Sequence, residues 1–201
     1  MLYQTVLFDF DGVLCHDRFY EKTLLPDYQG AYDWIQANVF GDDALIQKWM
    51  RNELKSDDVN KLVAENTDIA REMLDSLYME SVHKMGLDER VENLAKSLKL
   101  SGRKIGIVTN NMDVFSEITV GNHQLDKLFD IIVNSADYGR LKKDNNGELF
   151  DIAFATLNGS IKNSLMIDDS ASVIELYERR GGKGFLYKDF EGLESFLRAN
   201  G

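Results

Sequence analysis

The stretch Val6-Leu7-Phe8-Asp9-Phe10-Asp11-Gly12-Val13-Leu14 is an apolar run that stops on two carboxylates and then reaches a glycine. Residues 6–8 show no polar alternation, which is typical of a strand covered on both faces in a parallel sheet. Asp9 and Asp11 are two residues apart, so they point to the same side of an extended chain. Gly12 allows a sharp turn. The stretch therefore predicts either a site at the carboxyl end of a buried strand, where open α/β folds bind ligands, or an ordinary turn.

The composition of the 201 residues indicates a folded, acidic protein. Hydrophobic residues make up 44% of the chain, which supports a well-filled core and argues against disorder. The formal net charge is −11 and the pI is about 4.7, which disfavours nucleic acid and anionic membranes as partners. An anionic substrate is compatible with this charge because a bound divalent cation can reverse the local field.

Sequence features also bear on the compartment. The single cysteine, Cys15, excludes an intramolecular disulfide and fits a reducing compartment. The first residues do not resemble a signal peptide, since the predicted strand starts almost at once without a basic lead. No apolar run approaches the ~20 residues that a membrane helix needs. We therefore expect a soluble, cytoplasmic protein, monomeric or homodimeric, that binds neither membrane nor nucleic acid.

Residues 17–100 show no convincing strand and predict a succession of helices with apolar stripes at helical spacing. Ser56-Asp57-Asp58 and Thr67-Asp68 are typical helix starts. The second of them predicts a long helix that ends near Gly86. A further helix is predicted over residues 88–100, with Gly102 just beyond it.

From Arg103 onward, apolar strands alternate with helices. Strands are predicted over residues 104–108, 129–133, 164–167 and 184–187, with helices between them and a short terminal helix. This alternation predicts an α/β fold with a doubly wound parallel sheet. The first strand belongs to the same sheet, so the helical block is an insertion that we expect over the carboxyl edge of the sheet. The predicted domains are a core of residues 1–15 and 101–201 and an all-helical insertion of residues 16–100.

The predicted core strands end on polar groups. The carboxyl ends of parallel strands lie at one edge of the sheet, so we expect these groups to converge. The first strand ends on Asp9 and Asp11, the second on Thr109-Asn110-Asn111, and the fourth on Asp168-Asp169-Ser170, while the loop after the third carries Lys142 and Lys143.

Groups of these types suit phosphoryl transfer. Crowded carboxylates repel one another and call for a cation, and oxygen ligands without histidine or cysteine favour Mg²⁺ over zinc. A carboxylate held beside Mg²⁺ can attack phosphorus and form an acyl phosphate. A second carboxyl group can protonate the leaving oxygen and later deprotonate water. A lysine and a hydroxyl can hold the phosphoryl oxygens as charge builds on them.

The order of these motifs resembles the haloacid dehalogenase (HAD) superfamily. The matching residues are Asp9-Phe10-Asp11-Gly12-Val13, the strand end Thr109-Asn110, a lysine in the third loop, and Asp168-Asp169-Ser170. The helical insertion is similar to the C1 cap of subfamily I, which implies a Rossmann-like core. The resemblance implies a Mg²⁺-dependent hydrolase, a phosphatase that acts on a small phosphorylated metabolite through an aspartyl-phosphate intermediate.

The resemblance also implies a role for each matching residue. Asp9 would be the nucleophile and Asp11 the general acid/base, an acid that the haloacid dehalogenases proper usually lack. Thr109, Asn110 and Lys142 would bind the substrate phosphate, and Lys142 would also neutralise charge. The Mg²⁺ ligands would be the carboxylate of Asp9, the backbone carbonyl of Asp11, and the acids Asp168 and Asp169, of which Asp169 matches the commonest metal-binding position.

The sequence leaves open two alternatives to the phosphatase function and the choice of the motif lysine. A sugar phosphomutase uses the same first chemical step, and a non-catalytic homologue that binds phosphate or metal for regulation has the same motifs. The third motif, residues 142–147, lacks the prolines usual in this family, so either Lys142 or Lys143 can be the motif lysine. We prefer Lys142, which follows Gly139 at the family spacing. Cys15 is interpreted as a packed residue and His16 as a residue near the entrance of the site.

Overall fold

Strand β1 (Thr5–Phe8) lies at the centre of a five-stranded parallel sheet in the computed structural model, which describes residues 3–25 and 27–200. The strand order is β3-β2-β1-β4-β5. The first strand therefore pairs with both the second and the fourth, as a doubly wound sheet requires. The predicted α/β fold is confirmed. The other strands are β2 (Lys104–Thr109), β3 (Ile131–Asn134), β4 (Ser164–Asp168) and β5 (Lys183–Leu186).

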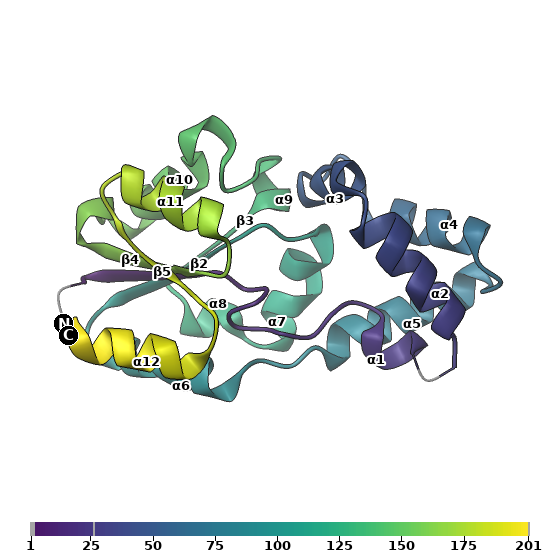
Figure 1. The fold of residues 1–201 in the computed structure, drawn as a ribbon, viewed down its shortest axis with the longest axis horizontal. Helices are drawn as coiled ribbons and strands as arrows, with labels where there is room; N and C mark the ends of the chain where they lie inside the picture. The colour runs from purple at the N-terminus through teal and green to yellow at the C-terminus, as the bar shows by residue number, and fades with distance from the viewer. Residues whose placement is uncertain (1–2, 26, 201) are drawn as a thin grey trace.

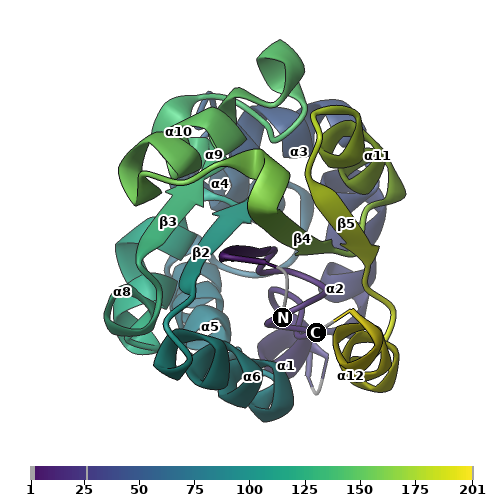
Figure 2. The same ribbon diagram turned by 90° about the vertical axis from the view of Figure 1, so that its left-hand side faces the viewer.

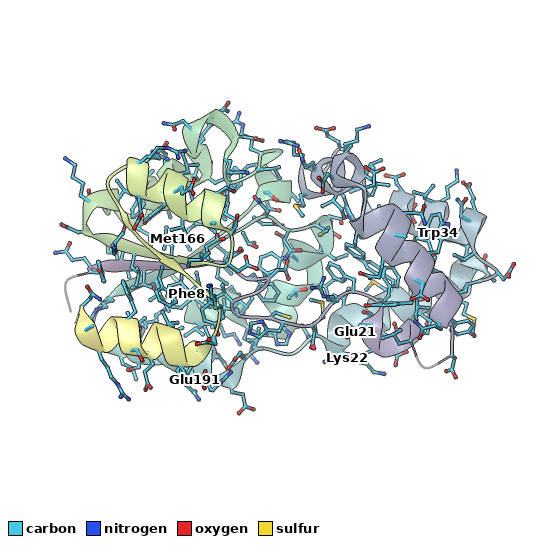
Figure 3. The ribbon with its side chains drawn as sticks, in the orientation of Figure 1. Phe8, Glu21, Lys22, Trp34, Met166 and Glu191 are labelled. Atoms are coloured by element: carbon cyan, nitrogen blue, oxygen red, sulfur yellow. The ribbon has the colours of Figure 1, made fainter. Side chains whose placement is uncertain are left out.

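Helices cover both faces of the sheet (Figure 2), which explains the unbroken apolar run at its centre. Leu7 and Met166 pack on one face, whereas Val6 and Phe8 pack on the other. Figure 3 shows Met166 and Phe8 on opposite sides of the sheet. The first face is covered by α10 (Glu148–Leu157) and α11 (Ala171–Arg179), and the second by α6 (Glu89–Leu100), α8 (Leu125–Leu128) and α12 (Phe190–Ala199).

The insertion between β1 and β2 lies beyond the carboxyl ends of the strands (Figure 1), and the regular elements among its described residues are all helices. Trp34, which Figure 3 labels, lies in this insertion. No helix among the described residues is both long and apolar enough to cross a membrane. The helices of the insertion are α1 (Glu21–Leu24), α2 (Gln29–Ile35), a π-helix (Gln36–Phe40), α3 (Asp43–Met50), α4 (Ser56–Asn66) and α5 (Arg71–Lys84); the core adds α7 (Val120–Asn122), α9 (Ser135–Tyr138) and a π-helix (Phe115–Thr119).

Helix α6 falls within the range 16–100 predicted for the insertion, yet it packs against the sheet. It contacts β2, and Arg90 at its start forms an ion pair of 3.0 Å with Glu191 of α12. Figure 1 shows α6 and α12 together below the sheet. We therefore propose that the insertion ends near Gly86 and that α6 belongs to the core. A helix of the insertion and a helix of the core have the same amphipathic pattern, so the sequence of α6 could not show to which of the two parts it belongs.

Two predicted element boundaries are corrected by local contacts. Helix α5 begins at Arg71 and not at Thr67. The Thr67 hydroxyl donates a hydrogen bond of 2.9 Å to the carbonyl of Val63, so this residue follows the end of α4 instead of starting α5. Strand β3 begins at Ile131, because Phe129 ends α8 and donates its backbone N–H to the carbonyl of Leu125.

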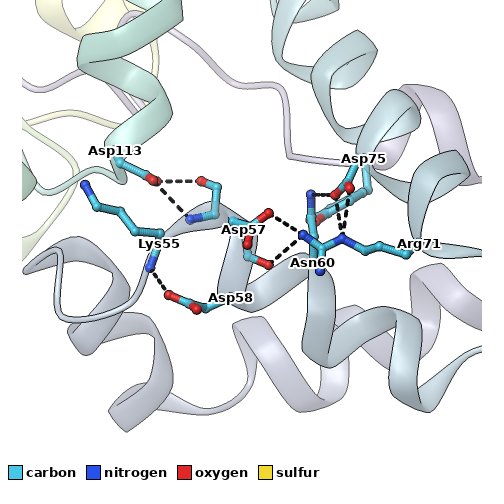
Figure 4. A network of polar contacts seen from close by, with 9 residues as sticks. Lys55, Asp57, Asp58, Asn60, Arg71, Asp75 and Asp113 are labelled. Carbon is cyan, nitrogen blue, oxygen red and sulfur yellow. Dashed lines mark hydrogen bonds and ion pairs between the residues drawn. The ribbon is translucent and has the colours of Figure 1, made fainter.

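Asp113, in the segment after β2, connects the core to the insertion (Figure 4). Its buried carboxylate accepts hydrogen bonds from the backbone N–H of Ser56 (3.0 Å), from the Ser56 hydroxyl and from Nε1 of Trp49 (3.1 Å). Ser56 starts α4, and Trp49 lies near the end of α3. The carboxylate therefore holds two helices of the insertion close to the loop that follows β2.

We expect Asp113→Ala to lower the free energy of unfolding by about 1–3 kcal/mol, because the buried N–H of Ser56 loses its acceptor. Nε1 of Trp49 keeps only its longer hydrogen bond to the Ser56 hydroxyl (3.3 Å). Urea denaturation followed by circular dichroism measures this change. Asp68→Ala removes an exposed carboxylate in the bend before α5 and should change the stability by less than about 0.5 kcal/mol. Equal destabilisation of the two variants would contradict this role of Asp113.

Candidate active site

Three carboxylates meet at the carboxyl ends of β1 and β4. Asp9, Asp168 and Asp169 each place one carboxylate oxygen within 4.8 Å of the others. Asp9 directly follows β1, and its backbone N–H donates to the carbonyl of Ile167 in β4 (2.9 Å). This bond continues the pairing of the two strands and fixes the position of Asp9. The convergence expected from strand polarity is therefore present for these acids.

Gly12 turns the chain beside this cluster. Its φ is 75°, in the left-handed region that favours glycine. A Cβ atom at this position would lie 2.2 Å from Oδ2 of Asp169. Glycine is therefore required both for the turn and for the close approach of the two segments. The turn and the site are not alternatives here, because the turn brings Asp11 and Asp169 to the same edge.

Lys142 is the lysine that reaches the acids. Its side chain is only 2% exposed, and Nζ lies 2.6 Å from Oδ2 of Asp9 and 2.7 Å from Oδ2 of Asp168. Lys143 is exposed, and its Nζ contacts the Ser172 hydroxyl at 3.0 Å. The structure therefore brings Lys142 into the cluster and leaves Lys143 outside it.

Side chains hold the backbone of the loop at Lys142 and at the residue before it. The backbone N–H of Lys142 donates to Oδ1 of Asn110 (2.7 Å), and the N–H of Leu141 donates to Oδ2 of Asp144 (2.9 Å). Asp144 in turn receives two hydrogen bonds, of 3.0 and 3.1 Å, from Arg51 of the insertion. The position of the buried ammonium therefore depends on β2 and on the insertion as well as on its own loop.

Negative charge at the site exceeds what one ammonium group neutralises. Burial raises the pKa of Asp9, although Lys142 opposes the shift, and the Asp168 charge adds to it. Burial likewise raises the pKa of Asp11 to about 7, with Lys142 opposing and Asp169 adding. Burial alone would lower the pKa of Lys142, but Asp9 and Asp168 hold it above its ordinary value. Such an arrangement favours the entry of a cation.

Strand β2 contributes a run of polar residues to the same edge. Thr109 is fully buried, and its Oγ1 has no hydrogen-bond partner among the described residues. A buried hydroxyl without a partner is costly, and an oxygen of a bound ligand would satisfy it. Asn110 faces the cavity described below and holds the backbone of Lys142, as given above. The structure thus brings Asn110 to the cavity, whereas Thr109 is buried at the carboxyl end of β2.

Asn111 is a site residue that the sequence places at this edge but to which sequence reasoning gave no role. Its Nδ2 donates to Oδ2 of Asp11 (2.8 Å), and its backbone N–H donates to Oδ1 of Asn134 (3.1 Å) and to Oγ of Ser135 (3.0 Å). It therefore orients the Asp11 carboxylate from a rigid position between β2 and β3. The adjacent amides in Thr109-Asn110-Asn111 were a signal of polar function, but the sequence does not show which amide faces Asp11.

A cavity of about 440 Å³ opens beside the acids, between the core and the insertion. Cys15 lines it but is buried, and burial raises the pKa of its thiol to about 12, so it fits the interpretation as a packed residue. His16 also lines the cavity and is exposed. Lys142, Thr109 and Asp168 do not line it. The core contributes Asp9, Asp11, Gly12, Asn110, Met112 and Asp169 to the lining, and the insertion contributes Phe19, Gln36, Phe40, Ile46, Met50 and Met85, with Asp17 and Arg18 between them.

A comparison with protein families agrees with this arrangement of sheet, insertion and acids. Residues 3–175 match the model of a hydrolase family described as haloacid dehalogenase-like hydrolase. This match spans most of the chain, so the protein belongs to the haloacid dehalogenase-like hydrolases. The resemblance inferred from the motifs is confirmed. Among curated proteins, none matches the sequence.

Several solved structures share the fold. A predicted HAD-like family hydrolase of Porphyromonas gingivalis is 13% identical, with a TM-score of 0.75 and 98% of this chain and 99% of that chain covered. A HAD family enzyme of Bacteroides thetaiotaomicron, in complex with magnesium and inorganic phosphate, is 14% identical, with a TM-score of 0.69 over 95% and 98% of the two chains. L-2-haloacid dehalogenase of Xanthobacter autotrophicus is 16% identical, with a TM-score of 0.67 over 99% and 84%. At these identities the likeness is one of fold.

Proposed function

We propose that the protein is a Mg²⁺-dependent phosphatase that hydrolyses a small phosphorylated metabolite through a phosphoryl group on Asp9. The observation that carries this proposal is the cluster of Asp9, Asp168 and Asp169, whose carboxylate oxygens lie within 4.8 Å of one another beside a cavity. The fold neighbour from Bacteroides thetaiotaomicron, which was crystallised with magnesium and inorganic phosphate, supports it.

The donor set fits Mg²⁺. Its groups are carboxylate oxygens, which suit a hard divalent cation. Both oxygens of Asp168 already have partners, Nζ of Lys142 (2.7 Å) and the N–H of Ser170 (2.8 Å), so Asp169 offers the freer carboxylate. Asp9 and Asp169, with Asp168 and the backbone carbonyl of Asp11, would hold the ion. When bound, Mg²⁺ stabilises negative charge on phosphoryl oxygens.

The residues divide the reaction into two displacements. An oxygen of Asp9 attacks phosphorus, the bond to the leaving oxygen breaks, and Asp11 donates a proton to that oxygen. Asp11 then takes a proton from the water that attacks the phosphoryl group and releases Asp9. Lys142 neutralises charge beside Asp9, and the unpartnered hydroxyl of Thr109 donates to a phosphoryl oxygen.

Asp11 favours a phosphate ester over a haloacid as substrate. A halide leaves as a stable anion, whereas the leaving oxygen of a phosphate monoester needs a proton. Asp11 faces the cavity, and Asn111 holds its carboxylate at 2.8 Å, which supports a role for Asp11 as the proton donor to a leaving oxygen bound there. This arrangement has no use in halide release.

The proposed function predicts phosphate release from p-nitrophenyl phosphate that requires Mg²⁺ and stops on chelation. A screen of phosphorylated metabolites then identifies the substrate class. Release of inorganic phosphate from a sugar phosphate supports the phosphatase, whereas interconversion of sugar phosphates without phosphate release would indicate a phosphomutase. A negligible rate for all substrates over a wide pH range would contradict catalysis.

We expect Asp169→Ala to raise the Mg²⁺ concentration for half-maximal activity by roughly tenfold or more, since metal-ligand changes weaken binding strongly. The rise in melting temperature on adding Mg²⁺ should shrink in parallel, which tests the ligand without turnover. Asp126→Ala, at an exposed position of α8, is the control and should keep both responses. Unchanged metal dependence in Asp169→Ala would show that this ligand assignment is wrong.

A further inference from the structure

Arg18 is the one lysine or arginine among the described residues that line the cavity. It lies on the segment that leads from Asp11 into the insertion. Its guanidinium forms no ion pair or hydrogen bond with another described side chain, although the nearby Asp17 and Lys22 pair with each other. Arg18 is exposed, and its planar guanidinium is available to a carboxylate or phosphate in the cavity.

Arg18 borders the same cavity as Asp9 and Asp169 of the core. Gln36 and Phe40, from the insertion, also border it. A ligand that contacts the carboxylates of the core from this cavity is therefore also close to the guanidinium.

Gln36 provides a second, independent observation. It lines the same cavity, and its Nε2 is buried without a hydrogen-bond partner among the described residues. It begins the π-helix Gln36–Phe40, which also places Phe40 in the cavity wall. Single π-helical turns are frequent at functional sites. A buried N–H without an acceptor is costly, and an oxygen of a ligand would accept this bond.

The remaining wall on the insertion side is apolar. Phe19 stacks on Phe40, with ring centroids 6.4 Å apart, and Ile46, Met50 and Met85 complete this wall. The cavity thus has an acidic end, an apolar wall, one arginine, and the buried, unpartnered Nε2 of Gln36. His16, Asp17 and Asn110 also line it. A single guanidinium matches the single charge of a carboxylate, whereas a second phosphate would bring about two negative charges at pH 7.

We propose that the leaving group of the substrate carries a carboxylate that binds Arg18 and accepts a hydrogen bond from Gln36. This inference rests on the proposed phosphatase function and specifies its substrate class, the phosphate monoester of a small hydroxy acid. The phosphoryl group would lie at Asp9 and the carbon body against the apolar wall.

Two phosphonates test the inference without turnover, because their P–C bond is not hydrolysed. They are 3-phosphonopropionate and propylphosphonate, in which a methyl group replaces the carboxylate. Isothermal titration of the full chain with Mg²⁺ should show roughly tenfold tighter binding of 3-phosphonopropionate, as expected for one charge-assisted pair. Arg18→Gln should abolish this preference, and Gln36→Leu should reduce it. Arg198→Gln, on α12, makes the same charge change at a side chain that is 75% exposed and should keep the preference.

Two outcomes would overturn the inference. They are equal binding of the two phosphonates by the wild type, and an unchanged preference in Arg18→Gln. If Arg18→Gln weakens both phosphonates equally, the arginine acts on the phosphoryl group instead. The proposed function is tested separately by wild-type turnover of p-nitrophenyl phosphate, which has no carboxylate. A carboxylate preference that depends on Arg18 in a protein without turnover would therefore refute the phosphatase and leave the anion site in place.

Discussion

Asp9→Asn is expected to reduce phosphate release by more than about 10³-fold, because an amide oxygen cannot replace the carboxylate as nucleophile. The substitution keeps the size of the side chain and an oxygen that can accept the hydrogen bond from the Phe10 N–H (2.7 Å). Its effect on packing should therefore be small, and Lys142 keeps its ion pair with Asp168 (2.7 Å) although it loses the one with Asp9. The turnover number at saturating Mg²⁺ and substrate measures the loss, and circular dichroism verifies that the variant is folded.

Asp137→Asn is the control for Asp9→Asn, because Asp137 is an exposed carboxylate of the core that does not line the cavity. It should retain the wild-type turnover number within about twofold, as surface changes usually do. A substantial rate in Asp9→Asn would remove Asp9 from the mechanism. Equal, negligible rates in the wild type and Asp9→Asn would instead favour a regulatory homologue that binds phosphate or metal without turnover.

The meeting of Asp9 and Asp168 could be predicted from the sequence because it follows from strand polarity. Each acid comes at the end of an apolar run, and the carboxyl ends of parallel strands lie at one edge. The direction of a side chain within a loop has no such rule. Lys142 and Lys143 are adjacent and chemically identical, yet one is buried between carboxylates and the other is exposed. Only the contacts of the loop with Asn110 and Asp144 decide between them.

The individual contacts between the insertion and the core could not be predicted for a related reason. Apolar spacing identifies a helix and its buried face, but not the surface against which that face packs. Asp113 and Trp49 meet across 64 residues of sequence, and Asp144 and Arg51 across 93. The sequence does not mark Gln36 as a candidate site residue. It became one only because the packed structure leaves its Nε2 buried without a hydrogen-bond acceptor among the described residues.

Lys142→Met is expected to have the second large effect, on stability as well as on activity. Methionine fills a similar volume, but it leaves the carboxylates of Asp9 and Asp168, now 2.6 and 2.7 Å from Nζ, buried without a counter-charge. Breaking a buried ion pair in this way costs about 3–5 kcal/mol. Urea denaturation in the presence of a chelator measures the loss. Lys143→Met removes an exposed lysine from the next position and should cost less than about 0.5 kcal/mol.

Added Mg²⁺ separates the two roles of Lys142. A cation among the carboxylates replaces part of the missing charge, so saturating Mg²⁺ should recover part of the stability that Lys142→Met loses. It should not restore activity, because the ammonium group beside Asp9 would still be absent as charge builds on the phosphoryl oxygens, and a lost stabilising donor costs roughly 10²–10³-fold in rate. Recovery of both stability and turnover by Mg²⁺ would show instead that Lys142 only holds the carboxylates together, which would remove it from the chemistry proposed for this site.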